Sequence, residues 1–241
     1  AKGCSSSCLT DRWHHQDGIH AFAFSGSITD GLKIFSNYLQ DFGTHSTAHI
    51  YIEGAGMTNT MIYNNVLVTT GDNYAANGDV AIKAATGTKV YNNTFVGNNR
   101  GAAVLIHSGA QNSDIKNNII RNLYTGIYLD DTSSIVSNFN CFYGINNWYF
   151  RGRLYYSLSN WQSLGYDSYS IGSDPILNAS YKLTPSSPLF ARQGGVNLSS
   201  VFTTDKDGTA RGTVGGWSLG AYVYDGSYSG LLPPSGFRVV Y

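Results

Sequence analysis

Imidazole and carboxylate side chains crowd into one short stretch near the start of the chain. The sequence WHHQDGIHAF, residues 13–22, holds His14, His15 and His20, three of the six histidines, together with Asp17. Such groups transfer protons and bind metal ions. Because charged residues make up only 12% of the chain, this clustering predicts that the stretch belongs to a functional site.

The composition favours a secreted, β-rich protein and excludes several classes of function. The chain has 241 residues and a formal net charge of +0. It therefore lacks the basic surface that binds nucleic acid, and we expect no nucleic-acid partner. It also has no apolar run of about 18 residues, so we expect no membrane span.

Three cysteines indicate the redox environment of the protein. Cys4 and Cys8 are close enough to form a disulfide, which would fit an oxidising compartment, and the alternative is a pair of free thiols. Cys141, in the apolar context NFNCFYG, is expected to be a buried free thiol. We therefore expect a secreted or cell-surface location.

A β-rich unit repeats through the first 140 residues. Each copy alternates apolar and polar residues at period two and carries an asparagine, with steps of 28, 28, 25 and 20 residues. Repeats of this length bury their faces only by stacking, and a corner asparagine can bond its counterpart about 4.8 Å away in the next coil. The pattern predicts a parallel β-solenoid. The aligned asparagines are Asn37, Asn65, Asn93, Asn118 and Asn138.

These Asn-bearing coils resemble the right-handed parallel β-helix proteins of the pectate-lyase-like group. The tail DPILNASYKLTPSSPLFARQGG, followed by TTDKDGTARGTVGGWSLGAYVYDG, is similar to the C-terminal end of many secreted bacterial β-helix proteins of unassigned activity. The resemblance implies an all-β fold, a right-handed parallel β-helix of about five coils plus an irregular C-terminal β cap. Relatives with this fold include polysaccharide lyases, glycoside hydrolases, uronan epimerases, tailspikes and adhesins. No complete catalytic motif of any of these matches, so no catalytic set is carried over.

The same resemblance divides the chain into four parts. We expect an N-terminal segment at 1–12, β-helix coils at 13–145, a C-terminal coil and cap of the same domain at 146–226, and a Pro/Gly-rich linker or tail at 227–241. Uncovered coil edges invite pairing. We therefore expect end-to-end self-association or missing flanking modules.

A second strand in each coil places most of the rare ionisable residues on one face. Its apolar residues point into the solenoid and the residues between them point outward. The outward columns are Phe22, Glu53, Lys83, His107 and Asp130; His20, Tyr51, Ala81, Leu105 and Tyr128; and Gly18, His49, Asp79, Ala103 and Gly126.

These columns predict a catalytic set for proton abstraction next to a sugar carboxylate. That reaction needs a base, an acid and a cation for the developing negative charge. Lys83 is a candidate base or charge neutraliser. The carboxylate of Glu53, which also belongs to the predicted catalytic set, lies about 4.8 Å away on the next strand and raises the pKa of a lysine, which favours the neutraliser role. The acid–base candidates are His49, His20 and Tyr51, and the expected substrate-binding residues are His15, Asp17, His107, Asp130 and Trp148.

Other interpretations of this face stay open. The charged column could be a solvated ladder across coils. A hydrolase needs two carboxyl groups about 5.5 Å or about 6.5–9.5 Å apart, whereas Glu53 and Asp130 lie about 14 Å apart at three coil spacings. A metal site could use His20, His49 and Asp17, and a divalent cation is the cofactor that such a set would bind.

Two further stretches have both a structural and a functional interpretation. The aromatic-rich residues 146–161 could stack on sugars or cover the last coil. The DKDG sequence at 205–208 predicts an Asx turn rather than a calcium site.

The sequence thus predicts a secreted carbohydrate-active β-helix protein whose partner is a polysaccharide. We expect action on an acidic polysaccharide by proton abstraction or β-elimination. The alternatives are a non-catalytic β-helix surface, adhesin or assembly protein, and a glycoside hydrolase.

Overall fold

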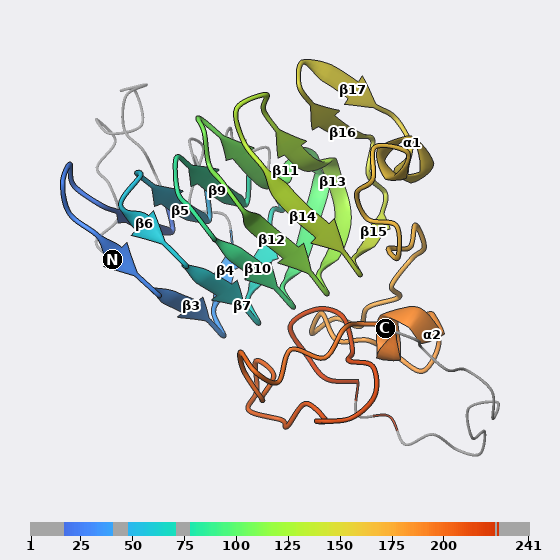
Figure 1. Cartoon of the computed structure of the whole chain (residues 1–241). Helices are drawn as coiled ribbons and strands as arrows, with labels where there is room; N and C mark the ends of the chain where they lie inside the picture. The colour runs from blue at the N-terminus through green and yellow to red at the C-terminus, as the bar shows by residue number, and fades with distance from the viewer. Residues whose placement is uncertain (1–16, 41–47, 71–77, 225, 227–241) are drawn as a thin grey trace, which may run out of the picture.

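The computed structural model describes residues 17–40, 48–70, 78–224 and 226, and its main body is a stack of coils made of parallel strands (Figure 1). The largest sheet in this part of the chain has ten strands. It contains, in spatial order, β1 (Ile19–Phe22), β5 (Ile50–Glu53), β9 (Val80–Lys83), β11 (Thr94–His107), β13 (Ile119–Leu129), β16 (Asn147–Phe150) and β17 (Arg153–Tyr155), and its side members are β4 (Tyr38–Gln40), β8 (Val66–Val68) and β15 (Cys141–Tyr143).

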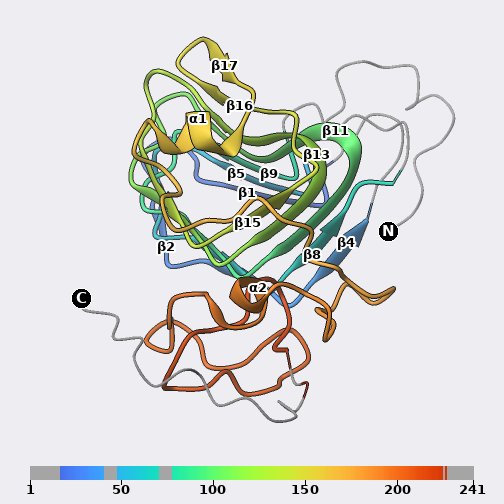
Figure 2. The same ribbon diagram turned by 90° about the vertical axis from the view of Figure 1, so that its right-hand side faces the viewer.

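A second sheet and a short third one complete the coils. The five-stranded sheet contains β3 (Lys33–Phe35), β7 (Met61–Tyr63), β10 (Lys89–Tyr91), β12 (Ser113–Lys116) and β14 (Ile135–Asn138), and the two-stranded sheet contains β2 (Thr29–Asp30) and β6 (Met57–Thr58). In the view along the stack, β11 and β13 bend around one side of the coil (Figure 2). These two long strands therefore join the strands on two faces of the solenoid into a single sheet. The all-β solenoid predicted from the repeats is confirmed.

The predicted columns of the second strand are confirmed by the strand register. Phe22 pairs with Glu53, Glu53 with Lys83, and Lys83 with His107, all in parallel. Along each of these strands, the residues that alternate with the outward ones point into the solenoid and fill its core, because successive side chains of a strand point to opposite faces. The core members from these strands include Ile50, Ile52, Val80, Ile82, Val104, Ile106, Ile127 and Leu129.

An asparagine ladder joins the coils at one corner. Asn65 donates from its backbone N and its Nδ2 to Oδ1 of Asn93, at 3.0 and 2.9 Å. Asn93 bonds Asn118 in the same way, and Asn37 bonds Asn65. Each amide also donates to a backbone carbonyl, as Asn93 does to Ile62. The ladder therefore fixes the register of successive coils.

The fifth ladder position was predicted wrongly. Asn118 bonds Oδ1 of Asn140, at 2.9 and 3.0 Å, and not Asn138. Asn138 instead accepts from the backbone N of Phe139 and of Tyr169. The last step is 22 residues rather than 20, because the two asparagines stand two apart and the period-two pattern does not distinguish them.

The ladder ends on a buried carboxylate. Asn140 donates from Nδ2 to Oδ1 of Asp167 at 2.9 Å, and Ser170 donates to the same oxygen. The other oxygen accepts from the hydroxyl of Ser137 and from Nε1 of Trp161, both at 2.8 Å. Burial raises the pKa of Asp167 above its ordinary value, against the effect of these four donors.

The residue before each ladder asparagine adopts a left-handed backbone, and the three of these residues that are asparagines bind the C-terminal segment. Asn64, Asn92 and Asn117 have φ between 50° and 59°, a region that asparagine tolerates. Nδ2 of Asn64 donates to the carbonyl of Thr204, and Nδ2 of Asn92 donates to that of Ser218. The segment that includes α2 (Leu189–Gln193) thus lies along the outside of the asparagine corner (Figures 1 and 2).

A hairpin and a short helix lie at the end of the stack opposite β1 (Figure 1). Strands β16 and β17 pair antiparallel, and α1 (Leu158–Gln162) follows them. Trp161 of α1 is fully buried in the core cluster of the solenoid. No helix in the described part of the chain is long and apolar enough to cross a membrane.

The cysteine predictions have different outcomes. Cys141 is a buried free thiol, as predicted, and burial raises its pKa to about 12. Its Sγ donates to the carbonyl of Ser173 at 3.2 Å. Cys4 and Cys8 lie outside the described residues, so their disulfide stays a prediction.

We predict that Asn93→Ala lowers the free energy of unfolding by about 2–4 kcal/mol, because it removes ladder bonds on both sides and leaves buried partners unpaired. Urea unfolding followed by circular dichroism measures this loss. The control is Asn160→Ala on the exposed side of α1, which should change stability by less than about 0.5 kcal/mol. Equal stability of the two variants would contradict the structural role of the ladder.

Candidate functional site

The predicted face contains a continuous chain of polar contacts across three coils. His20 Nε2 lies 3.2 Å from Oε2 of Glu53, and Oε1 of Glu53 accepts from Nζ of Lys83 at 2.8 Å. On its other side, Nδ1 of His20 lies 3.5 Å from a carboxylate oxygen of Asp17. The structure therefore brings together four of the predicted site residues.

The central ion pair holds both of its groups in their charged forms. The hydrogen bond from Lys83 lowers the pKa of Glu53, and the hydrogen bond to Glu53 raises the pKa of Lys83. The two side chains remain 32% and 38% exposed, so solvent and a ligand can reach them. A charged Lys83 can neutralise an anion but cannot serve as a base, because its ammonium carries no free electron pair.

Tyr51 supports His20 from the neighbouring coil. The two rings stack at 4.9 Å with an interplanar angle of 15°. Tyr51 is only 3% exposed, and burial raises the pKa of its hydroxyl. The expectation that Tyr51 is exposed to substrate is therefore wrong, and its contact with His20 fixes the position of the imidazole ring.

His49 is also buried, contrary to the expectation that it reaches a substrate groove. Its side chain is 1% exposed, and Nδ1 lies 3.0 Å from Oδ1 of Asp79. The hydroxyl of Thr69 donates to the same carboxylate oxygen at 3.0 Å. The register was right, but this column is covered, so His49 and Asp79 form a buried structural pair.

His107 continues the column beyond Lys83. Burial, followed by the charge of Lys83, lowers the pKa of His107. Its Nδ1 lies 3.0 Å from the hydroxyl of Ser108. His107 therefore presents a neutral imidazole beside a cation near neutral pH.

Asp130, predicted as a substrate-binding residue, caps a turn. One carboxylate oxygen accepts from the backbone N of Ser108 at 2.6 Å, and the other accepts from the backbone N of Thr132 at 3.1 Å. The hydroxyl of Ser133, these two backbone bonds and the hydroxyl of Thr132 together lower the pKa of Asp130 despite its partial burial. The hydrogen bonds of Asp130 therefore stabilise the turn, which explains its position without a bound substrate.

Trp148 was expected on the substrate side, and the structure places it in the core instead. It is 3% exposed and packs edge-on against Phe142, with the ring centroids 5.3 Å apart. Trp161 is also buried. Of the two interpretations of residues 146–161, these two tryptophans fit the structural one. They cover the last coil, because the hairpin and α1 close the end of the core.

The remaining site predictions concern His15 and metal ions. His15 lies outside the described residues. Within the described ranges, no group of three or more His, Cys, Asp or Glu side chains is arranged to hold a metal ion. In the DKDG sequence, Oδ1 of Asp205 accepts from the backbone N of Asp207 and of Thr209, so the predicted Asx turn is confirmed.

The sequence prediction placed Phe22 on the outward face but missed Phe24, which forms an exposed aromatic pair with it beside the site. Phe24 is 73% exposed and meets Phe22, itself 48% exposed, edge to face at 4.9 Å. Phe24 follows Phe22 by two residues, so period-two alternation was a signal that could have found it. The pair extends the exposed face past β1.

Comparisons with known proteins address the fold and the family. Searches of curated proteins and of solved structures found no match. The family model described as a right-handed β-helix region matches residues 6–163, about two thirds of the chain. Parallel coils, inward apolar columns and a corner ladder agree with that match. The chain belongs to the right-handed β-helix family.

Proposed function

We propose that this β-helix protein is carbohydrate-active and acts on an acidic polysaccharide by abstracting a proton next to a sugar carboxylate. The observation that carries the proposal is the position of Lys83, a partly exposed cation with Glu53 on one neighbouring strand and His107 on the other. Abstraction of a proton from a uronate requires a base and, close to it, a cation that stabilises the negative charge formed.

In this proposal Lys83 binds the sugar carboxylate. An ammonium has three N–H donors, and the contact with Glu53 uses one of them. A bound carboxylate would gain charge-assisted hydrogen bonds, which are stronger than neutral ones. Lys83 would then stabilise the negative charge that develops when the adjacent carbon loses its proton. The electron pair of that C–H bond forms a C4–C5 double bond as the C4–O glycosidic bond breaks, and the leaving oxygen takes a proton from water.

His107 is the base in this proposal, in place of the buried His49. It would accept the proton on Nδ1, which lies beside the hydroxyl of Ser108, because its Nε2 is buried. Its lowered pKa keeps the imidazole neutral and able to accept a proton. His20 acts as a positioning residue, because it bridges Asp17 and Glu53 and thereby orients the carboxylate beside Lys83. Phe22 and Phe24 would offer exposed ring faces to neighbouring sugar units.

A polysaccharide substrate also fits a secreted or cell-surface location, which we include in the proposal. Polymers of this kind lie outside cells, and an exposed face running along the stack accommodates a chain without enclosing it. In this proposal Lys83 of the Glu53–Lys83 ion pair is the cation that contacts the acidic sugar.

The second candidate is a non-catalytic β-helix surface or adhesin. One observation favours it, because Glu53 and Lys83 neutralise each other and Asp130 is engaged by its turn, as in a solvated ladder. A glycoside hydrolase gains less support, because the register keeps Glu53 and Asp130 three strands apart.

We predict that the protein cleaves at least one uronan in a panel, seen as ultraviolet absorbance of an unsaturated uronyl product. Lys83→Met and His107→Gln should each lower kcat/KM by at least about 100-fold, the scale of one electrostatic or acid–base contribution. The control is Lys182→Met, which removes a more exposed ion pair with Asp207 on the C-terminal segment and should keep full activity.

If both site variants keep full activity on a substrate that the parent cleaves, the site lies elsewhere. If no uronan or neutral glycan is cleaved, the non-catalytic candidate is correct.

We predict that kcat/KM rises with pH through the lowered pKa of His107, because the base must be neutral. Lys83→Met should raise that pKa, since a nearby cation disfavours the imidazolium. NMR titration of the His107 ring measures the pKa independently of activity. An unchanged His107 pKa in Lys83→Met would contradict the proposed coupling.

The same shift predicts how stability depends on pH. A histidine whose pKa is lowered by folding binds its proton more readily in the unfolded chain, so stability falls as the pH drops through the ordinary histidine pKa of about 6.5. Chemical unfolding across that range should show a smaller decrease for His107→Gln than for the parent.

A further inference from the structure

One column of side chains crosses five successive coils on the face that carries Lys83. It follows β1, β5, β9, β11 and β13, whose order along the stack is visible in Figure 1. Parallel pairing places its members on adjacent strands, about 4.8 Å apart. In spatial order they are Phe22, Glu53, Lys83, His107 and Asp130.

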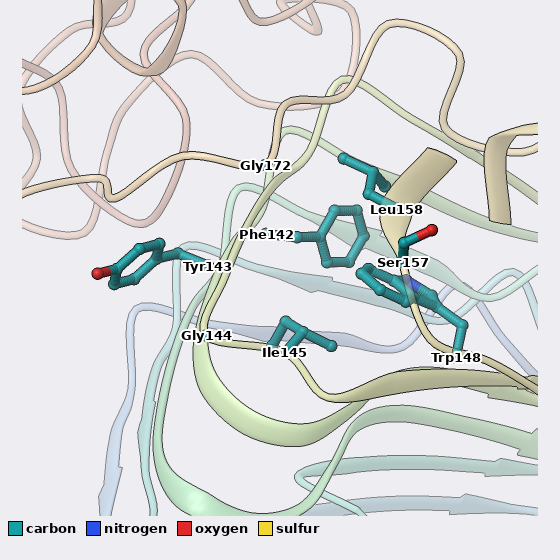
Figure 3. Close-up of a pocket in the computed structure, with 8 residues that line it drawn as sticks. All are labelled: Phe142, Tyr143, Gly144, Ile145, Trp148, Ser157, Leu158 and Gly172. Atoms are coloured by element: carbon teal, nitrogen blue, oxygen red, sulfur yellow. The ribbon is translucent and has the colours of Figure 1, made fainter. Parts of the chain in front are cut away.

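A polymer can contact this column but not the interior of the last coil. Glu53 and Lys83 are partly exposed, and Phe22 is exposed. Figure 3 shows a hollow at the last coil between the rings of Phe142 and Trp148. Both rings are buried, as is Nε1 of Trp148, so a sugar does not reach them. The outward column therefore provides the contacts to a substrate.

The column contains one cation and two carboxylates. The contact between Lys83 and Glu53 holds both groups in their charged forms. Hydrogen bonds from its turn keep the pKa of Asp130 low despite partial burial, and burial lowers the pKa of His107. Because the neutral imidazole and the ring of Phe22 add no charge, the column as a whole is negative near neutral pH. Within it, only Lys83 attracts a carboxylate.

A sugar chain that lies along the column meets these groups one unit at a time, because a pyranose unit is about as long as the spacing between strands. A uronate bound to Lys83 then has one neighbouring sugar beside Glu53 and, on the other side, sugars beside His107 and Asp130. A carboxylate on these neighbours would face a like charge, and such juxtapositions reject a partner. A hydroxyl group would instead donate a hydrogen bond to Glu53.

The next cation along this face stands beyond Asp130. Arg151 is exposed, and its backbone N donates to the carbonyl of Leu129, which places it in the following coil. Lys83 and Arg151 are therefore separated by three strand spacings, about 14 Å. A chain with a charge on every sugar would place carboxylates between these two cations, beside His107 and Asp130. A chain with neutral sugars between its uronates avoids that repulsion.

We propose that the substrate is an acidic polysaccharide whose uronates are separated by neutral sugars, rather than a homopolymer of uronates. This inference rests on the proposed function, because it concerns the polymer that binds at Lys83. The isolated carboxylate contacts Lys83, and a hydroxyl group of the neighbouring neutral sugar donates to Glu53. The exposed ring of Phe22 contacts the C–H face of a further sugar.

The test compares two forms of one uronan backbone. Polygalacturonate carries a carboxylate on every sugar, and partial methyl esterification of the same preparation makes some of these groups neutral. At low salt we expect kcat/KM of the full chain to be at least about tenfold higher on the esterified form. Added sodium chloride should reduce this ratio, because salt screens exposed charges. The same pair of forms is prepared from any other uronan that the activity panel identifies.

Glu53→Gln tests whether charge causes the preference. The amide keeps the shape of the side chain and can still accept a hydrogen bond from Lys83, but it does not repel a carboxylate. We expect the ratio between the two forms to fall by at least about threefold. The control is Asp207→Asn, which removes one negative charge from an exposed ion pair on the C-terminal segment and should leave the ratio unchanged.

The outcomes separate this inference from the proposed reaction. Equal kcat/KM on the two forms, or a higher value on polygalacturonate, would overturn the inference and leave the reaction intact. An unchanged ratio in Glu53→Gln would also overturn it, because the preference would then come from the methyl groups and not from charge. If no uronan of either charge pattern is cleaved, the proposed function fails and the inference fails with it.

Discussion

The hydrogen bonds of the corner asparagines are the constraint on which the rest of the structure depends. Each inner amide accepts two bonds from one coil and donates to the next, as Asn93 does between Asn65 and Asn118. Because an amide can do this only when its counterpart lies directly above or below, the ladder sets both the spacing and the register of the coils. A shift of one residue would turn every core side chain toward solvent.

Where the residue before a ladder position is an asparagine, as at Asn64, Asn92 and Asn117, it performs a different task. Its left-handed backbone turns the side chain outward, where it binds the C-terminal segment. Arg211 strengthens that contact, because it donates to Oδ1 of Asn64 and to the carbonyl of Gly220 while lying against the rings of Phe202 and Trp217. Burial lowers its pKa to about 10, so the guanidinium still stays charged near neutral pH.

The functional face follows from the same register. Because Glu53, Lys83 and His107 occupy one column, their charges act on one another at the spacing of adjacent strands. This neighbourhood accounts for the raised pKa of Lys83 and contributes to the lowered pKa of His107. The catalytic and the non-catalytic candidates differ in one respect, namely whether Lys83 exchanges part of its contact with Glu53 for a substrate carboxylate.

The sequence by itself determined the solenoid, four of the five ladder asparagines, the outward column through Lys83 and the buried thiol of Cys141, because period-two alternation and repeat spacing are local properties. Only the tertiary structure decided that His49 and Trp148 are buried and that Asn140 completes the ladder. Alternation tells which side of a strand a residue occupies. How deeply that side is covered depends on segments distant in the chain, and sequence periodicity does not encode their packing.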